Sequence, residues 1–144
     1  MSASVRREPE PLDPSYERVV LSSGTGVEAA FVPGAGMVGS SLMLDGVELL
    51  APRHGIAGYL SRGSTFGIPL LHPWANRLAS PHQVVGDVAW DVVVGSPGVH
   101  RDDNGLPIHG LVAGLDAWEV VIEAASDGEA RLSAVLRWDE SLDR

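Results

Sequence analysis

Two short segments hold most of the side chains that can do chemistry, and the first runs from Phe66 to Leu78. It reads FGIPLLHPWANRL, so glycine and proline stiffen the backbone around Trp74, Asn76 and Arg77. An aromatic ring, an amide and a guanidinium suit a sugar, because apolar CH groups lie on rings and hydroxyls accept from forked donors. The same residue types also suit a core tryptophan and a surface arginine, and the segment alone leaves that alternative open.

The second segment is the polar loop from Asp102 to Gly110, which reads DDNGLPIHG. His109 lies there between an apolar dipeptide and a glycine. An imidazole in this position can donate a hydrogen bond to a ligand oxygen or exchange a proton, since its ordinary pKa is about 6.5. The alternative is a histidine satisfied by backbone groups, and the loop alone does not choose between the two.

Taken together, the two segments resemble the aldose 1-epimerase (galactose mutarotase-like) family. The resemblance rests on G-I-P-L-x-x-P-W-x-N-R at 67–77, followed by P-I-H-G at 107–110. Residues 27–50 also resemble the opening strands of that family, with a Gly-Ala-Gly bend, a strand and an Asp-Gly turn. The strands that follow Trp118 are similar as well, so the resemblance covers residues 18–140.

This resemblance implies an all-β protein, an antiparallel β-sandwich of galactose mutarotase type (a supersandwich), of which the chain is roughly the N-terminal half. Family members interconvert the α and β anomers of aldoses. A base removes the proton of the anomeric hydroxyl while an acid protonates the ring oxygen, and the ring opens and closes again. No metal or organic cofactor is needed, and the implied partner is a small-molecule aldose.

The resemblance also assigns roles to individual residues. Arg77 would bind sugar hydroxyls with support from Asn76, and His109 would be the catalytic histidine near the reacting centre. Trp74 and His72 complete the predicted substrate-binding set. His72 stands where many relatives have an aromatic residue, either as a local substitution or as a second polar contact.

The general acid and general base of the family lie in its C-terminal part, beyond the last residue of this chain. We therefore expect an isomerase-family protein that by itself is inactive or weakly active. The alternative is a non-catalytic carbohydrate-binding or regulatory module, or a degenerate remnant of the enzyme. Half of a sandwich leaves strand edges uncovered, so self-association through those edges is also expected.

Three glycine-containing dipeptides lie between runs of strand-forming residues, and each predicts a β-hairpin, because two-residue turns need positive φ. They are Asp45-Gly46, Gly86-Asp87 and Asp127-Gly128. Further strands are predicted at 27–32 and 37–44. We expect a flexible N-terminal tail at 1–17, followed by one sandwich domain at 18–144. The stretches 52–66 and 96–106 are expected to be irregular, and no long amphipathic helix is predicted.

The last hairpin alternates clearly enough to predict its core face. Apolar residues repeat with a period of two in both strands, at Trp118, Val120, Ile122 and Ala124 and at Leu132, Ala134, Leu136 and Trp138. Glu119 and Glu123 fall on the opposite face.

Composition excludes several classes of function. A net charge of −9 repels phosphate backbones, so nucleic acid is not an expected partner, and no Lys/Arg cluster suits an acidic membrane. The chain has no cysteine, a polar start in place of a signal-peptide core, and no apolar run long enough to span a membrane. A cytoplasmic protein is expected.

Two motif matches are set aside. Residues 34–39 match G-x-G-x-x-G, but a dinucleotide site needs a helix after that loop, and a predicted hairpin follows instead. The five histidines include no H-x-H or H-x-x-x-H pair, so no metal site is predicted.

Overall fold

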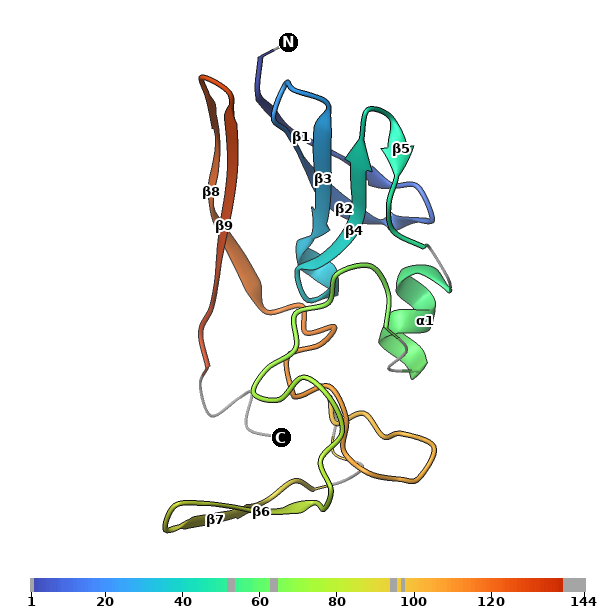
Figure 1. Ribbon diagram of the computed structural model, residues 1–144, viewed down its shortest axis with the longest axis vertical. Coiled ribbons are helices and arrows are strands. Elements are labelled where there is room, and N and C mark those ends of the chain that lie inside the picture. The colour runs from blue at the N-terminus through green and yellow to red at the C-terminus, as the bar shows by residue number, and fades with distance from the viewer. Residues whose placement is uncertain (1, 52–53, 63–64, 94–95, 97, 139–144) are drawn as a thin grey trace.

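The computed structural model describes residues 2–51, 54–62, 65–93, 96 and 98–138. Its main element is a five-stranded antiparallel sheet in the order β1-β2-β3-β4-β5. The strands are β1 (Ser4–Glu10), β2 (Asp13–Ser22), β3 (Val27–Val32), β4 (Val38–Leu44) and β5 (Val47–Glu48). Each strand pairs with the next one along the chain, so the sheet is a meander (Figure 1).

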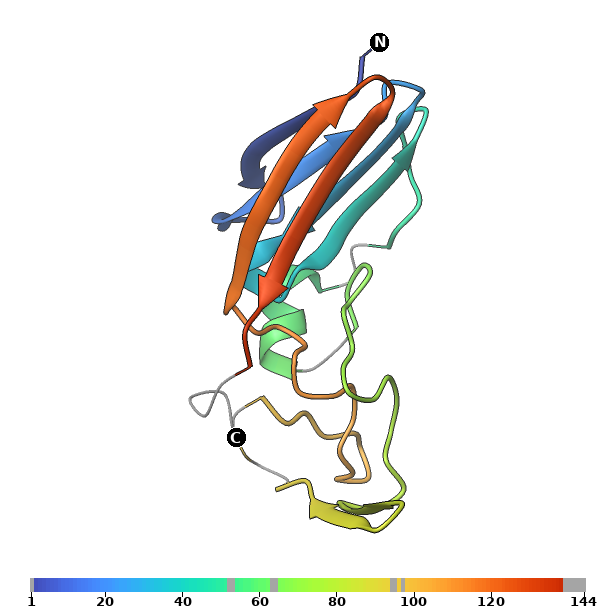
Figure 2. The ribbon, with the colours of Figure 1, turned by 90° about the vertical axis from the view of Figure 1, so that its left-hand side faces the viewer.

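A second layer covers one face of this sheet. It is the hairpin of β8 (Trp118–Ser126) and β9 (Glu129–Leu136), which contacts β1 and β2. Figure 2 shows the hairpin lying in front of the five-stranded sheet, with its strands running in nearly the same direction. The described residues are thus mostly antiparallel strands with little helix, in a sandwich-like arrangement, and the predicted all-β character is confirmed.

A third hairpin lies at the opposite end of the molecule from the main sheet (Figure 1). It consists of β6 (His82–Val85) and β7 (Val88–Asp91). All three predicted hairpins are therefore confirmed. The G-x-G-x-x-G segment forms a short 3₁₀ turn, η1 (Pro33–Ala35), that leads into β4, which confirms that no dinucleotide-binding helix follows it.

The helix α1 (Gly55–Arg62) corrects the prediction that 52–66 is irregular. Ile56, Tyr59 and Leu60 lie at helical spacing; the first two are buried and the third packs against the core. They join a core cluster that also holds side chains from the ends of β3 and β4 and from the loop before β8. The helix is two turns long and contains two interior or terminal glycines, which weakens its signal in the sequence.

The flexible tail predicted for 1–17 is also wrong, because β1 and the start of β2 occupy it. Apolar alternation is weak here, and cross-strand ion pairs stabilise the strands instead. Arg6 binds Glu28 at 2.9 Å, and Arg18 binds Glu8 at 2.5 Å. Pro9 is tolerated because β1 is an outer strand of the sheet, where a missing N–H does not break a ladder.

One face assignment in the last hairpin is corrected by a β-bulge. The register shifts between Val120 and Ile122, so that Glu123 stands opposite Leu132 on the face toward the sheet. Glu123 there accepts a hydrogen bond from Arg7 of β1. Ile122 moves to the outer face, where 39% of it is exposed. The alternation predicted from Trp118 onward therefore holds only as far as the bulge.

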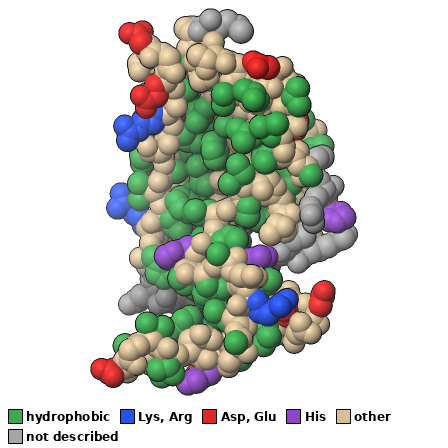
Figure 3. Space-filling view, in the orientation of Figure 1, with side chains coloured by type: hydrophobic (Ala, Val, Ile, Leu, Met, Phe, Trp, Pro, Cys, Tyr) green, Lys and Arg blue, Asp and Glu red, His purple; other side chains and the backbone are tan. Residues whose placement is uncertain are grey.

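Several hydrophobic side chains are exposed to solvent on one face of the molecule. Figure 3 shows them gathered over the upper part of the face that Figure 1 presents. Exposed residues from β3 to the segment after β5 include Val27, Leu44, Val47 and Leu49. No helix of the described residues has the length and apolar character needed to cross a membrane.

Candidate functional site

The two segments singled out by their residue types lie side by side. Arg77 and Ile108 form an antiparallel β-bridge, and the backbone N–H of Leu78 donates to Pro107 O at 2.9 Å. These contacts join positions about thirty residues apart along the chain. The polar residues of both segments therefore lie close to one isolated bridge.

A second, separate bridge joins the two segments on the other side of His109. His72 and Gly110 form a parallel bridge, and the N–H of Leu111 donates to His72 O at 2.7 Å. Gly110 has a φ of 75°, and a Cβ at this position would overlap the carbonyl group of His72. The glycine of the I-H-G motif is thus required by the close approach of two backbones.

His109 has a left-handed backbone with a φ of 71°, which is uncommon for a residue with a side chain. Its N–H donates to Asn76 O at 3.3 Å, and its Nδ1 atom lies 3.1 Å from Ala75 O. A carbonyl oxygen only accepts, so Nδ1 carries the proton. Neutral His109 therefore offers Nε2 as an acceptor, and the imidazolium offers it as a donor. Non-glycine residues held in this conformation cluster at functional sites, which makes His109 a candidate.

Arg77 is positioned by a residue that the sequence analysis did not select. Its Nε atom contacts Asp102 Oδ2; the Asp102 side chain is 4% exposed and that of Arg77 is 48% exposed. The carboxylate also accepts N–H groups from Leu106 at 2.8 Å and Asn104 at 2.9 Å. Burial alone would raise the pKa of Asp102, but these hydrogen bonds and Arg77 outweigh it and lower the pKa below its ordinary value.

A pocket of about 420 Å³ adjoins the paired segments. It is lined by His72, Pro73, Trp90, Leu111 and Trp138. Of the predicted substrate-binding residues, His72 alone is among the residues that line it. Two indole rings and an imidazole in one concave site form a surface on which a sugar ring can lie.

Trp74 and Asn76 contribute differently from their predicted roles. The ring of Trp74 packs against that of Trp90, with centroids 6.0 Å apart and an interplanar angle of 37°. Its indole N–H is buried and finds no partner among the described residues. Asn76 supplies its backbone carbonyl to His109, and its side chain is not seen supporting Arg77.

Three further candidates were missed, and each has a signal in the sequence. Asp102 heads an Asp-x-Asn turn, in which an aspartate accepts the N–H two residues later. Trp90 lies in a predicted hairpin, and Trp138 was predicted on a core face. Among the described residues, no three His, Cys, Asp or Glu side chains gather as metal ligands do. Neither the models of protein families nor the curated proteins include a match to this chain.

Proposed function

We propose that this chain binds an aldose in the pocket beside the two paired segments, as a protein of aldose 1-epimerase type with the corresponding mutarotase-type sandwich. The observation that carries the proposal is the bridge between Arg77 and Ile108. It brings together the two segments on which the resemblance to the aldose 1-epimerase family rests.

The pocket supplies the apolar part of such a site. Trp90 and Trp138 would lie against CH groups of the sugar, and His72 would offer a nitrogen to a hydroxyl at the edge. The packing of Trp74 against Trp90 fixes the orientation of the latter ring. A preset aromatic wall lowers the entropic cost of binding.

The paired side chains of Arg77 and Asp102 favour an uncharged sugar over a phosphorylated one. Asp102 balances the charge of Arg77, so no free positive charge remains on that pair to attract a phosphate. Arg77 still has a half-exposed side chain whose amino groups can donate to hydroxyls. The net charge of −9 further disfavours an anionic ligand.

Anomer interconversion would require more than binding. The anomeric hydroxyl must lose its proton to a base, the bond between C1 and the ring oxygen must break, and that oxygen must gain a proton from an acid. Nε2 of neutral His109 can take one of these roles. The paired segments supply two imidazoles, His72 and His109, of which His72 alone is among the residues that line the pocket. The site therefore supports sugar binding more strongly than fast catalysis, and a non-catalytic carbohydrate-binding module is the second candidate.

Tryptophan fluorescence, read as D-galactose, D-glucose and glucose 6-phosphate are added in turn, tests the proposal. We expect saturable quenching with a neutral aldose, weakened in both Arg77→Ala and His109→Ala. Arg131→Ala, which removes an exposed arginine from β9, serves as the matched control. Absence of saturable binding to every aldose in a folded sample would overturn the proposal.

Polarimetry of fresh α-D-glucose then separates the two candidates. Acceleration that is lost in His109→Ala indicates a mutarotase. Binding without acceleration indicates a carbohydrate-binding module.

A further inference from the structure

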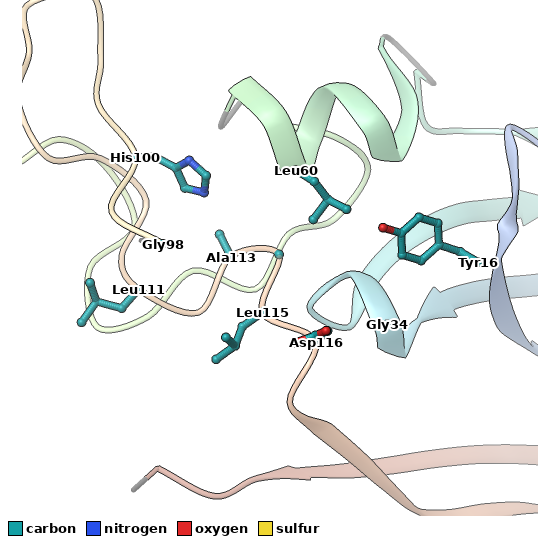
Figure 4. A pocket seen from close by; sticks show the side chains of 10 residues that line it. Tyr16, Gly34, Leu60, Gly98, His100, Leu111, Ala113, Leu115 and Asp116 are labelled. Carbon is teal, nitrogen blue, oxygen red and sulfur yellow. The ribbon is translucent and has the colours of Figure 1, made fainter. Parts of the chain in front are cut away.

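A second pocket, of about 360 Å³, opens between the main sheet, α1 and the loop that precedes β8 (Figure 4). Tyr16 of β2 and His100 reach toward it from opposite sides, while Leu60 of α1 and Asp116 lie between them. Its volume falls within the range of small-molecule sites, about 300–1,000 Å³. None of these four residues belongs to the paired segments.

Two glycines keep this pocket open. A Cβ at Gly34 would stand 3.6 Å from Tyr16 Cδ1, and a Cβ at Gly114 would stand 2.7 Å from Leu60 Cδ2. Both Tyr16 and Leu60 line the pocket, so side chains at these glycines would fill it or displace its walls. Gly34 has an ordinary backbone conformation, whereas Gly114 has a φ of 74°. Position 34 therefore accepts a larger residue without backbone strain.

The polar side chains on the two sides of the pocket are the imidazole of His100 and the phenol of Tyr16. Burial lowers the pKa of His100 below its ordinary value; a hydrogen bond with the Ala113 backbone opposes this, and the nearby charge of His109 adds to it. Of the residues that the structure describes, none that lines the pocket is a lysine or an arginine. Asp116, the one carboxylate, is exposed, so solvent and salt screen its charge.

We propose that this pocket binds a small uncharged polyol, a molecule with several adjacent hydroxyl groups. Each hydroxyl both donates and accepts, which matches one phenol, one neutral imidazole and one acceptor carboxylate. Leu60 provides an apolar surface for the carbon chain. An anion would meet Asp116 without a compensating cation, and a cation would find its counter-charge only where water screens it.

This site is distinct from the proposed aldose pocket, although Leu111 lines both. The aldose pocket is walled by indole rings, whereas the polyol pocket presents hydrogen-bonding groups on opposite sides. The inference does not rest on the proposed function, because it uses neither Arg77 nor His109 as a ligand-binding group.

Amide NMR shifts of the full chain test the inference, with xylitol as the neutral probe, inorganic phosphate as the anion and choline as the cation. Gly34, Gly98 and Gly114 line the pocket, and their amide signals report on it. We expect saturable shifts at these amides with xylitol and none with phosphate or choline. Saturable shifts with choline, or xylitol shifts at Trp90 in place of the glycines, would overturn the inference, as would no saturable shift.

Two variants separate binding from folding. Gly34→Leu should fill the pocket and abolish the xylitol response, and Tyr16→Phe, which removes one hydroxyl and keeps the ring, should weaken it about tenfold. Trp90→Phe is the control at the other pocket and should leave xylitol binding unchanged. If Gly34→Leu loses its folded spectrum, Tyr16→Phe decides, and an unchanged response in Tyr16→Phe contradicts the inference.

Discussion

Arg77 and Asp102 are in contact although they differ widely in exposure, at 48% and 4% of their side chains. The covered carboxylate is anchored by backbone N–H groups of Asn104 and Leu106, and it holds a guanidinium that remains open to solvent. Asp102 is therefore a positioning residue. It limits the directions in which Arg77 can point, and it offsets the positive charge of the guanidinium.

Asp102→Asn keeps the shape of this side chain and removes its charge. The hydrogen bond from Arg77 becomes weaker, and we expect aldose affinity to fall about tenfold, the usual worth of a charge-assisted bond. Asp103→Asn, at the exposed neighbouring position, is the control and should leave affinity unchanged. Equal affinity in both variants would show that Arg77 does not need Asp102.

The same carboxylate predicts a pH effect on stability. Because the folded state lowers the pKa of Asp102, its contribution is fully present above the unfolded pKa of about 3.9 and is lost as pH falls through the lower folded value. Urea unfolding at pH 7 and pH 3 should therefore show a smaller acid-induced loss for Asp102→Asn than for the parent chain. An identical loss in both proteins would argue against this linkage.

Gly110→Ala should destabilise the protein strongly. Its Cβ would overlap the carbonyl group of His72, and its φ of 75° is unfavourable for alanine. We expect a loss of more than about 3 kcal/mol in the free energy of unfolding, measured in urea. Gly86→Ala has a φ of 61° and no atom within 4 Å of the new Cβ, so it isolates the backbone cost of about 1–2 kcal/mol. Similar losses at both positions would contradict the close approach.

Glu10 should matter more to stability than its exposed counterpart Glu17. Glu10 is 2% exposed, accepts from Ser40 Oγ at 2.8 Å and lies 3.7 Å from Arg18. Glu10→Ala leaves the Ser40 hydroxyl without this acceptor and removes one of the two carboxylates near Arg18, which keeps Glu8, at a cost of about 1–3 kcal/mol. Glu17→Ala removes one of the two carboxylate partners of Arg7 at an exposed position and should cost less than about 1 kcal/mol. Thermal or urea unfolding distinguishes the two, and a smaller effect at Glu10 would contradict its buried role.

His100 should titrate below the ordinary histidine value of about 6.5. Between its folded pKa and that value the unfolded state binds more protons, so stability rises with pH in this window and is constant above it. Imidazole proton NMR measures the pKa directly. A measured pKa at or above the ordinary histidine value would show that the His100 ring is not buried as described.

Local sequence signals were sufficient for the hairpins. Asp45-Gly46, Gly86-Asp87 and Asp127-Gly128 each occupy a tight turn, because positive φ and flanking strand propensity act within a few residues. The strand at 27–32 and the bend before β4 were predictable for the same reason. The prediction was wrong for β1 and α1, because distant partners stabilise these elements and their local sequence signals are weak. Ion pairs stabilise β1, and α1 is held by its buried Ile56 and Tyr59.

For the candidate site, residue types left both Arg77 and His109 open between a structural and a binding role. The resemblance of the two segments to the aldose 1-epimerase family singled them out, and their sugar-binding role stays a prediction. Only the tertiary structure placed Asp102 against Arg77, turned Trp90 and Trp138 toward one pocket, and moved Glu123 to the inner face through a bulge. Tight turns depend on residues that are neighbours along the chain, so they can be predicted from the sequence. Side-chain partners depend on which distant backbones pair and in which register, and a shift of one residue reverses every face that follows it.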